Sequence, residues 1–312
     1  MIKTENVTKR YASHVAVEHL NLDVRAGEIY GFLGPNGAGK TTTIHMLLNL
    51  VRPSSGDIYL FGEPLAPTSF LFKRGIGVVA EEPVEPSKMT GWELVRYFAG
   101  LYGMTRPEPR MEKLFHTLEL WEVRHGLARN YSRGMRQKLS LIRALIHEPQ
   151  LLILDEPVSG LDPHGILQVR SLIEEYHRQG GTVFISSHIL SEIERSADRI
   201  GILHEGRLLV EDSLTGLRRR LAPGQRFVIE LDSIPAGLMA RLANEPFVTE
   251  ITEKGQHIEM LVQAQHDVRP RIFHLVADAG GVILGMHSEE MSLEEAFVTI
   301  TGDNVAQLAG AI

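Results

Sequence analysis

The amino-acid sequence predicts an α/β protein built from two domains, residues 1–220 and residues 221–312. Strands and helices alternate through the middle of the chain, and such alternation indicates a parallel sheet flanked by helices. The chain has 312 residues, more than one hydrophobic core usually supports. Its formal charge also changes, from net +1 before residue 221 to net −8 after it. We therefore expect a larger α/β domain followed by a small, acidic α+β domain.

Short strands are expected in the first third of the chain, where apolar and polar residues alternate between turn signals. They cover residues 2–8, 18–24, 28–33, 57–61 and 76–79. Among them, the apolar-rich stretch 41–51 has the length of a helix and ends at the Arg-Pro-Ser-Ser-Gly turn of residues 52–56.

Helical periodicity dominates residues 92–120, with interruptions at Pro107 and Pro109. A further helix is expected at 133–146, and it ends before Pro149. From there the expected elements are strand 151–154, helix 165–179, strand 182–186, helix 189–195 and strand 200–203.

The boundary between the domains is predicted at the basic run Arg218–Arg220, which is followed by Ala-Pro-Gly. Beyond it the expected order is strand 227–231, helix 235–243, strand 247–252, strand 258–262, helix 268–278, strand 282–287 and a short helix 293–300. A β-α-β-β-α-β order is that of a ferredoxin-like domain.

Composition excludes several classes of protein. The absence of cysteine excludes a disulfide framework, a thiolate zinc site and a cysteine nucleophile. The net charge of −7 argues against a general binder of polyanions. The N-terminus lacks the apolar core of a signal peptide, and no window approaches the roughly 18 apolar residues of a membrane helix. We expect a soluble chain that reaches a membrane only by docking on another protein.

A glycine-rich segment carries the clearest chemical signal. It reads Gly-Pro-Asn-Gly-Ala-Gly-Lys-Thr, matches G-x-x-x-x-G-K-[ST], and lies between a predicted strand and a predicted helix. Glycines let backbone N–H groups face the phosphates of a nucleotide, and the helix N-terminus and a lysine add positive charge. The alternative is an ordinary glycine-rich turn. The residues assigned to the nucleotide are Gly34, Pro35, Asn36, Gly37, Ala38, Gly39, Lys40, Thr41 and Thr42.

Two carboxylates follow the apolar strand at 151–154. Ligands of open α/β sheets bind at the carboxyl ends of strands, so Asp155 and Glu156 are expected there. Asp155 suits the shell of a Mg²⁺ ion, to which the Thr41 hydroxyl would also bind. Glu156 suits the polarisation of a water for attack on a phosphate. Alternatively, the two acids could simply cap a helix before Pro157.

A third segment, Tyr-Ser-Arg-Gly-Met at residues 131–135, opens a helix, with Ser132 as N-cap and Gly134 permitting close backbone approach. With the two preceding motifs it makes residues 1–220 resemble the nucleotide-binding subunit of an ATP-binding cassette (ABC) transporter. The signature of that family is L-S-G-G-Q, so this chain lacks its first glycine and its glutamine. The resemblance implies a P-loop ATPase domain with a mixed sheet, an antiparallel β-subdomain and a helical subdomain.

The resemblance also implies roles for further residues. Tyr11 resembles the aromatic that stacks on adenine, unless it is a core tyrosine. Ser159 and Asp162 resemble the D-loop, and with Ser132 and Gly134 they would contact ATP held by a second subunit. His188 resembles the switch histidine that contacts the γ-phosphate. The other histidines are interpreted as surface or core residues.

One position departs from the family. Where the family has its Q-loop glutamine, this chain has Glu81, which follows the strand at 76–79. A carboxylate can still bind Mg²⁺ or its water, so we retain Glu81 as a metal residue. By resemblance, residues 82–101 belong to the helical subdomain that receives the transporter's coupling helix.

The tail motif Ser-Leu-Glu-Glu-Ala-Phe, residues 292–297, resembles the end of an extra domain in ATPases of type-two exporters, such as those for antibiotics, sodium or lipids. The hypothesis is therefore an ATPase, using ATP and Mg²⁺, that dimerises with a second ATPase subunit and drives a polytopic membrane permease from the cytoplasmic face. Two alternatives are a soluble ABC ATPase that acts on nucleic acid or the ribosome, and a degenerate cassette that only binds ATP. The acidic tail and the single cassette disfavour nucleic acid as a partner.

Overall fold

The computed structural model describes residues 1–66, 71–82, 88–188, 193–221, 225–264 and 266–289. Two compact units make up the chain, Met1–Ser213 and Leu214–Ile312. The boundary stated from the sequence lies at the C-terminal end of helix α7 (Leu214–Leu221), which this division assigns to the second unit. The tail motif at 292–297 and the helix expected at 293–300 lie outside the described residues.

The first unit begins with an antiparallel sheet in the order β2-β1-β4-β5. Its strands are β1 (Ile2–Tyr11), β2 (His14–Val24), β4 (Ser55–Leu60) and β5 (Glu63–Pro64). Buried and exposed residues alternate along β2, as expected for a strand with one face on a core. The antiparallel β-subdomain implied by the family resemblance is thus present.

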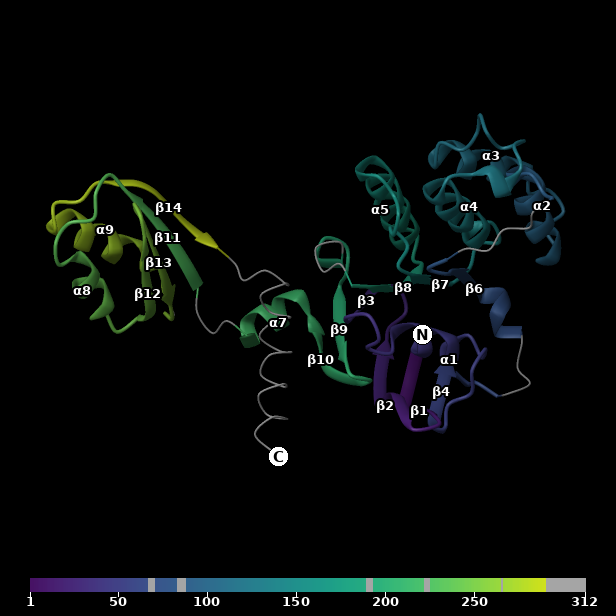
Figure 1. Cartoon of the computed structure of the whole chain (residues 1–312), viewed down its shortest axis with the longest axis horizontal. Coiled ribbons are helices and arrows are strands. Elements are labelled where there is room, and N and C mark those ends of the chain that lie inside the picture. The colour runs from purple at the N-terminus through teal and green to yellow at the C-terminus, as the bar shows by residue number, and fades with distance from the viewer. Residues whose placement is uncertain (67–70, 83–87, 189–192, 222–224, 265, 290–312) are drawn as a thin grey trace. The chain divides into compact units, whose positions relative to one another are not determined.

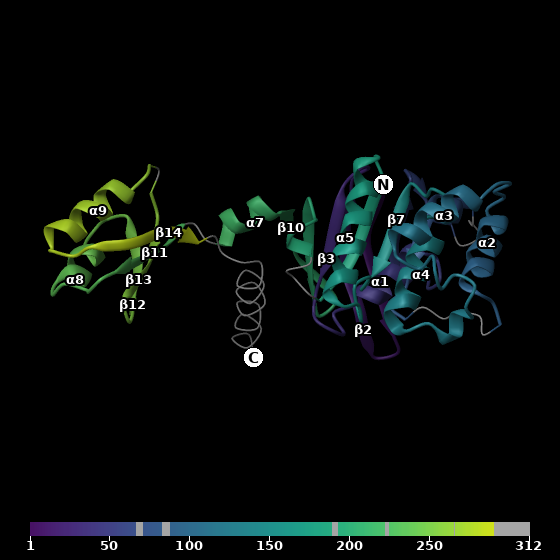
Figure 2. The ribbon, with the colours of Figure 1, turned by 90° about the horizontal axis from the view of Figure 1, so that it is seen from above.

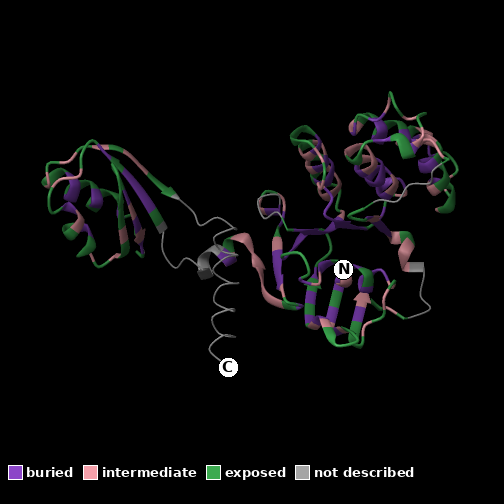
Figure 3. Ribbon diagram, viewed as in Figure 1, coloured by how far each residue is buried: buried purple, intermediate pink, exposed green. Residues whose placement is uncertain are grey.

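A six-stranded sheet forms the centre of the first unit, in the order β10-β9-β3-β8-β7-β6. Its strands are β3 (Ile29–Leu33), β6 (Ile76–Val79), β7 (Leu151–Asp155), β8 (Thr182–Ser187), β9 (Arg199–His204) and β10 (Arg207–Ser213). All neighbours are parallel except β9 and β10, so the expected mixed sheet is confirmed. The three central strands are buried along their whole length, as Figure 3 shows.

Helices cover both faces of the six-stranded sheet (Figure 1). Helix α1 (Lys40–Leu47) lies between this sheet and the antiparallel one, in contact with β2 and β7. The opposite face of the six-stranded sheet carries α5 (Pro163–Arg178) and a group of three helices, which Figure 2 shows from above. These three are α2 (Gly91–Leu101), α3 (Glu108–Thr117) and α4 (Arg133–Leu145). This group is the expected helical subdomain. The described residues of this unit also form 3₁₀ helices at Leu71–Gly75 and Ala128–Asn130.

Local sequence explains where these helices begin. Thr90 caps α2, since its hydroxyl accepts from the Glu93 amide while the Glu93 carboxylate accepts from the Thr90 amide. Ser132 caps α4 and Asp162 caps α5, and each side chain accepts one hydrogen bond from a backbone amide of the first turn. The expected N-cap at Ser132 is therefore confirmed.

The hydrophobic core of the first unit lies between the two sheets and around α1. It includes Ile2, Leu20, Phe32, Leu47, Ile153 and Phe184, all nearly or wholly inaccessible to solvent. The central strands are apolar and are packed on both faces. This dense packing fixes the position of the sheet edge at which the strands end.

The second unit contains the β-α-β-β-α-β order that the sequence predicted. Its elements after α7 are β11 (Gln225–Leu231), α8 (Leu238–Ala243), β12 (Val248–Lys254), β13 (His257–Val262), α9 (Arg269–Asp278) and β14 (Ile283–Glu289). Its strands form one antiparallel sheet, β12-β13-β11-β14, with both helices packed on one face around Ile229, Met260 and Ile272.

Strand β10 was not predicted from the sequence. Its residues Leu208, Leu209 and Val210 are consecutive and apolar, so they lack the alternation of a strand. The strand forms because Glu205 and Gly206 both adopt positive φ, in a tight turn that folds β10 back along β9. None of the helices formed by the described residues has the length and apolar character needed to cross a bilayer.

Candidate functional site

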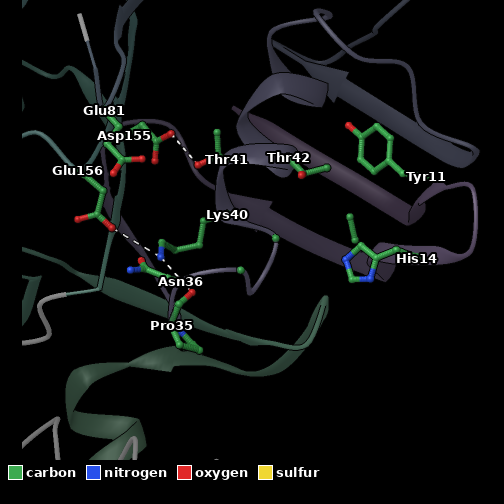
Figure 4. A pocket seen from close by; sticks show the side chains of 13 residues that line it. Tyr11, His14, Pro35, Asn36, Lys40, Thr41, Thr42, Glu81, Asp155 and Glu156 are labelled. Atoms are coloured by element: carbon green, nitrogen blue, oxygen red, sulfur yellow. Dashed lines mark hydrogen bonds and ion pairs between the residues drawn. The ribbon is translucent and has the colours of Figure 1, made fainter.

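Four segments of the first unit surround a cavity of about 430 Å³. They are the ends of β1 and β2 beside their turn, the loop before α1 with the first residues of that helix, the loop after β6, and the end of β7 with the residue that follows it. Figure 4 shows Glu81, Asp155 and Glu156 on one side of this cavity and Tyr11 and His14 on the other. The lining residues are Tyr11, His14, Ala16, Pro35, Asn36, Gly37, Gly39, Lys40, Thr41, Thr42, Glu81, Asp155 and Glu156.

The loop between β3 and α1 needs its glycines for two different reasons. Gly37 and Gly39 have φ values of +82° and +108°, which residues with a side chain rarely adopt. A Cβ on Gly39 would also lie 2.4 Å from the backbone oxygen of Ala16. Gly34 does not line the cavity, but a Cβ there would lie 2.4 Å from the Leu203 oxygen. The loop therefore curls tightly enough to expose its backbone to the cavity.

Lys40, the first residue of α1, places a buried cation at the centre of the loop. Its Nζ donates to the backbone oxygens of Gly34 at 2.7 Å and Pro35 at 3.3 Å. It also forms an ion pair with Glu156, with 3.6 Å between Nζ and Oε1. A buried ammonium needs such partners because its desolvation is costly.

The carboxylate of Asp155 is held from two sides. Thr41 Oγ1 donates to its Oδ2 at 3.0 Å, and Ser186 Oγ donates to its Oδ1. The bond to Thr41 joins residues 114 positions apart in the chain. Asp155 pairs with Ser186 across the parallel strands β7 and β8, so both lie at the carboxyl edge of the sheet.

Glu156 directly follows β7 in a left-handed conformation, with a φ of 49°. Its Oε2 accepts a hydrogen bond from Nδ1 of His188, which lies 2.8 Å away just beyond β8. Its Oε1 is buried and, within the part of the chain that the structure describes, has no hydrogen-bond donor. A strained backbone and an unsatisfied acceptor facing a cavity are features of functional sites. Asp155 and Glu156 do not cap a helix, because the next helix, α5, begins at Pro163 and is capped by Asp162.

The far side of the cavity is formed by the turn between the first two strands. Tyr11 is 45% exposed, so it is not a core tyrosine, and Nζ of Lys9 lies 4.9 Å from its ring centre. His14 and Ala16 also line the cavity, although no sequence motif marks them as site residues. Their one sequence signal was that they lie at the start of β2, a few residues after Tyr11.

Other predicted site residues do not line this cavity. Ala38 is buried in the loop, and its amide donates to the Pro35 oxygen. Ser132, Gly134, Ser159 and Asp162 lie together at the starts of α4 and α5, where Nη2 of Arg133 donates to Ser159 Oγ at 2.8 Å. In the same chain the side chains of Ser132, Ser159 and Asp162 accept hydrogen bonds, for example from the Gly165 amide to Asp162 Oδ1 at 2.9 Å.

The donor set at the cavity fits Mg²⁺ and a nucleotide. The available side-chain ligands are the oxygens of Thr41, Asp155 and Glu81, and Mg²⁺ prefers oxygen ligands. No group of three or more His, Cys, Asp or Glu that could enclose a metal occurs among the described residues. Mg²⁺ usually takes one or two protein carboxylates and completes its shell with phosphate and water, and Asp155 and Glu81 can supply such carboxylates.

Comparisons with known proteins agree with this geometry. Residues 17–159 match the family described as ABC transporter, and residues 126–194 match one described as AAA domain, putative AbiEii toxin, Type IV TA system. The bacitracin transport ATP-binding protein of Bacillus licheniformis is 38% identical over 303 residues, which are 97% of each chain.

Solved structures agree as well. The structure of an ATP-binding subunit of an ABC transporter is 32% identical and has a TM-score of 0.67, covering 70% of this chain and 92% of that one. The dimeric structure of a bacterial ABC transporter cassette is 25% identical with a TM-score of 0.61, covering 69% and 99%. Because a relative so similar matches nearly the whole of both chains, this protein belongs to the ABC transporter family, as an ATP-binding subunit that hydrolyses ATP.

Proposed function

We propose that this protein is the motor of an ABC exporter, in which two copies close around ATP and hydrolyse it. The observation that carries the proposal is the cavity itself. It brings a buried lysine, oxygen ligands suited to Mg²⁺ and a histidine-bound glutamate to one edge of the six-stranded sheet. Edges of this kind are where open α/β sheets bind ligands.

In the proposed complex the triphosphate lies on the loop of residues 35–42. Lys40 supplies the cation, and the N-terminus of α1 supplies backbone donors and partial positive charge. Tyr11, exposed on the opposite wall, stacks on the adenine. Gly34 and Ala38 do not line the cavity, and they shape the loop that would hold the phosphates.

Mg²⁺ would be held by Thr41, with Asp155 and Glu81 binding it directly or through water. When bound, it neutralises the charge that develops on the phosphates. The bond from Thr41 to Asp155 supports this assignment, because it already aligns the two oxygen ligands.

Hydrolysis is assigned to Glu156 and His188. Glu156 accepts a proton from the attacking water at its Oε1, which has no other donor among the described residues. His188 holds Oε2 and thereby orients the carboxylate. The resemblance also gives His188 a contact with the γ-phosphate.

A second copy would complete each site. Ser132, Gly134, Ser159 and Asp162 lie away from the cavity of their own chain, at the positions that contact ATP across the dimer in this family. The intact set of sites in this one chain favours a homodimer. A dimeric relative in the family supports the arrangement.

The exporter role requires a polytopic membrane permease as partner, docked on the helical subdomain at the cytoplasmic face of the membrane. The similarity to a bacitracin transport protein along 97% of both chains supports an antibiotic of that type as cargo. The unit at 214–312 would stabilise or regulate the dimer. The net charge of −8 after residue 220 argues against nucleic acid as a partner.

Purification of the tagged chain from membranes of its source organism tests the proposal. We expect a permease with about six spans to co-purify, and ATP hydrolysis that requires Mg²⁺. Deletion of the gene should increase the sensitivity of the organism to bacitracin. Recovery of RNA or DNA without a membrane protein would contradict the exporter role.

A further inference from the structure

A buried hydroxyl on the strand beside the acid pair contacts both acidic residues. Ser186 lies near the end of β8, is wholly inaccessible to solvent and pairs with Asp155 in the sheet register. Its Oγ donates to Asp155 Oδ1, and its backbone oxygen accepts from the amide of Glu156 at 3.2 Å. One residue that is not part of the cavity wall therefore holds the side chain of one acid and the backbone of the next.

We propose that Ser186 is a positioning residue that orients Asp155 for the Mg²⁺ that accompanies the nucleotide. The proposal rests on the proposed function, because it concerns the same site. Thr41 Oγ1 and Ser186 Oγ donate to different oxygens of the carboxylate and so fix its rotation. Thr41 is itself a candidate metal ligand, whereas Ser186 lies behind the carboxylate and is free to act only as its support.

Removal of the Ser186 hydroxyl leaves Asp155 Oδ1 without its side-chain donor in a buried place. The carboxylate can then turn away from the cavity, or draw in water from it. Loss of a residue that orients a metal ligand typically lowers metal affinity or activity about 10–100-fold. Binding of nucleotide without metal should change little, because among the described residues the hydroxyl of Ser186 donates to Asp155 and its backbone oxygen accepts from Glu156, and neither bond reaches the loop of residues 35–42.

The same strand provides a matched control. Thr182, at the start of β8, is equally buried, and its Oγ1 accepts a hydrogen bond from the Gly27 amide at 2.9 Å. Thr182 lies at the opposite end of the strand from the acid pair. Thr182→Val therefore removes a buried hydroxyl of β8 without reaching Asp155.

The experiment measures the affinity for ADP by calorimetry, once with Mg²⁺ and once with EDTA, so that no turnover is involved. The ratio of the two affinities reports the contribution of the metal. We expect Ser186→Ala to lower that ratio about 10–100-fold while the affinity in EDTA stays within about twofold. Ser186→Thr, which keeps the hydroxyl, and Thr182→Val should keep the ratio of the parent protein.

Several outcomes would overturn the proposal. The first is a ratio of ADP affinities in Ser186→Ala that equals that of the parent protein. The second is a fall of that ratio in Thr182→Val as large as in Ser186→Ala. The third is a Ser186→Ala variant that also loses affinity for ADP in EDTA. If thermal unfolding shows that Ser186→Ala is not folded, Ser186→Cys decides, because a thiol is a weaker donor and should give an intermediate loss. A parent protein that binds no nucleotide would instead contradict the proposed function.

Discussion

Replacing Glu156 by glutamine tests the proposed chemistry most directly. The side chain is 6% exposed and lies between two groups, with Nδ1 of His188 at 2.8 Å from Oε2 and Nζ of Lys40 at 3.6 Å from Oε1. Glutamine has nearly the same shape, and its amide can still bond to the imidazole. What disappears is the negative charge and the ability to accept a proton from water.

The expected magnitude follows from that loss. General-base catalysis typically contributes about 10²–10⁴-fold, so turnover should fall by this factor. At 1.36 kcal/mol for each tenfold change, the barrier rises by about 2.7–5.4 kcal/mol. Binding of ATP should remain or strengthen, because one of the negative charges beside the phosphates is removed while Lys40 stays in place.

Two assays check this prediction. Phosphate release measures turnover, and size-exclusion chromatography with saturating Mg²⁺ and ATP measures dimerisation. The variant should accumulate as an ATP-bound dimer, because the pair opens only after hydrolysis, and EDTA should weaken that dimer. Glu81→Gln is the charge-matched comparison, since it removes one negative charge from the same cavity but no proposed base. Its turnover should fall less than tenfold.

Two results would refute this reasoning. A Glu156→Gln variant that hydrolyses ATP at the parent rate would remove Glu156 from the role of base. An inactive variant that binds ATP yet stays monomeric would count against contacts of Ser132 and Gly134 with the second subunit. An equal loss in Glu81→Gln, which removes a charge and a proposed metal ligand but no base, would show that the effect does not require the loss of a base.

Four further predictions concern the loop, the second unit and pH. Lys40→Ala should weaken ATP binding about 100-fold by calorimetry, because the phosphates lose a charge-assisted bond; unchanged affinity would contradict the loop assignment. Gly39→Ala should lower the thermal midpoint more than Gly37→Ala, since only the Gly39 Cβ meets a backbone oxygen, at 2.4 Å; equal shifts would disprove the steric argument. A chain ending at residue 220 should still bind ATP but dimerise less, and a folded fragment without nucleotide binding would refute the domain assignment. Burial lowers the pKa of the His147 imidazole below 6.5, so the unfolded chain binds this proton at a higher pH than the folded chain does. The free energy of unfolding should therefore fall as the pH drops below about 6.5. Chemical unfolding should show a smaller loss of stability at acid pH in His147→Phe than in the parent protein.

Local sequence was sufficient to predict most secondary structure and the chemical type of the site. The strand at 76–79 was predicted with the bounds that β6 has, and α4 differs from its prediction by one residue. These elements depend on patterns within a few residues of each other, such as a buried apolar run or an N-cap. The β10 hairpin was missed because its strand carries no alternation and forms only by pairing with β9.

The sequence alone was enough to propose which residues bind phosphate, hold a metal and activate water, because those abilities belong to the side chains and to the short turns that carry them. Only the tertiary structure decided which distant residues meet. The register between β7 and β8 brings Ser186 to Asp155, and the turn after β1 brings His14 to the far wall of the cavity. Such contacts depend on how strands pair and layers pack, because Asp155 and Ser186 are 31 positions apart in the chain and His14 is more than a hundred positions from Asp155. No local pattern records that pairing, so the supports of the site became visible only in the folded chain.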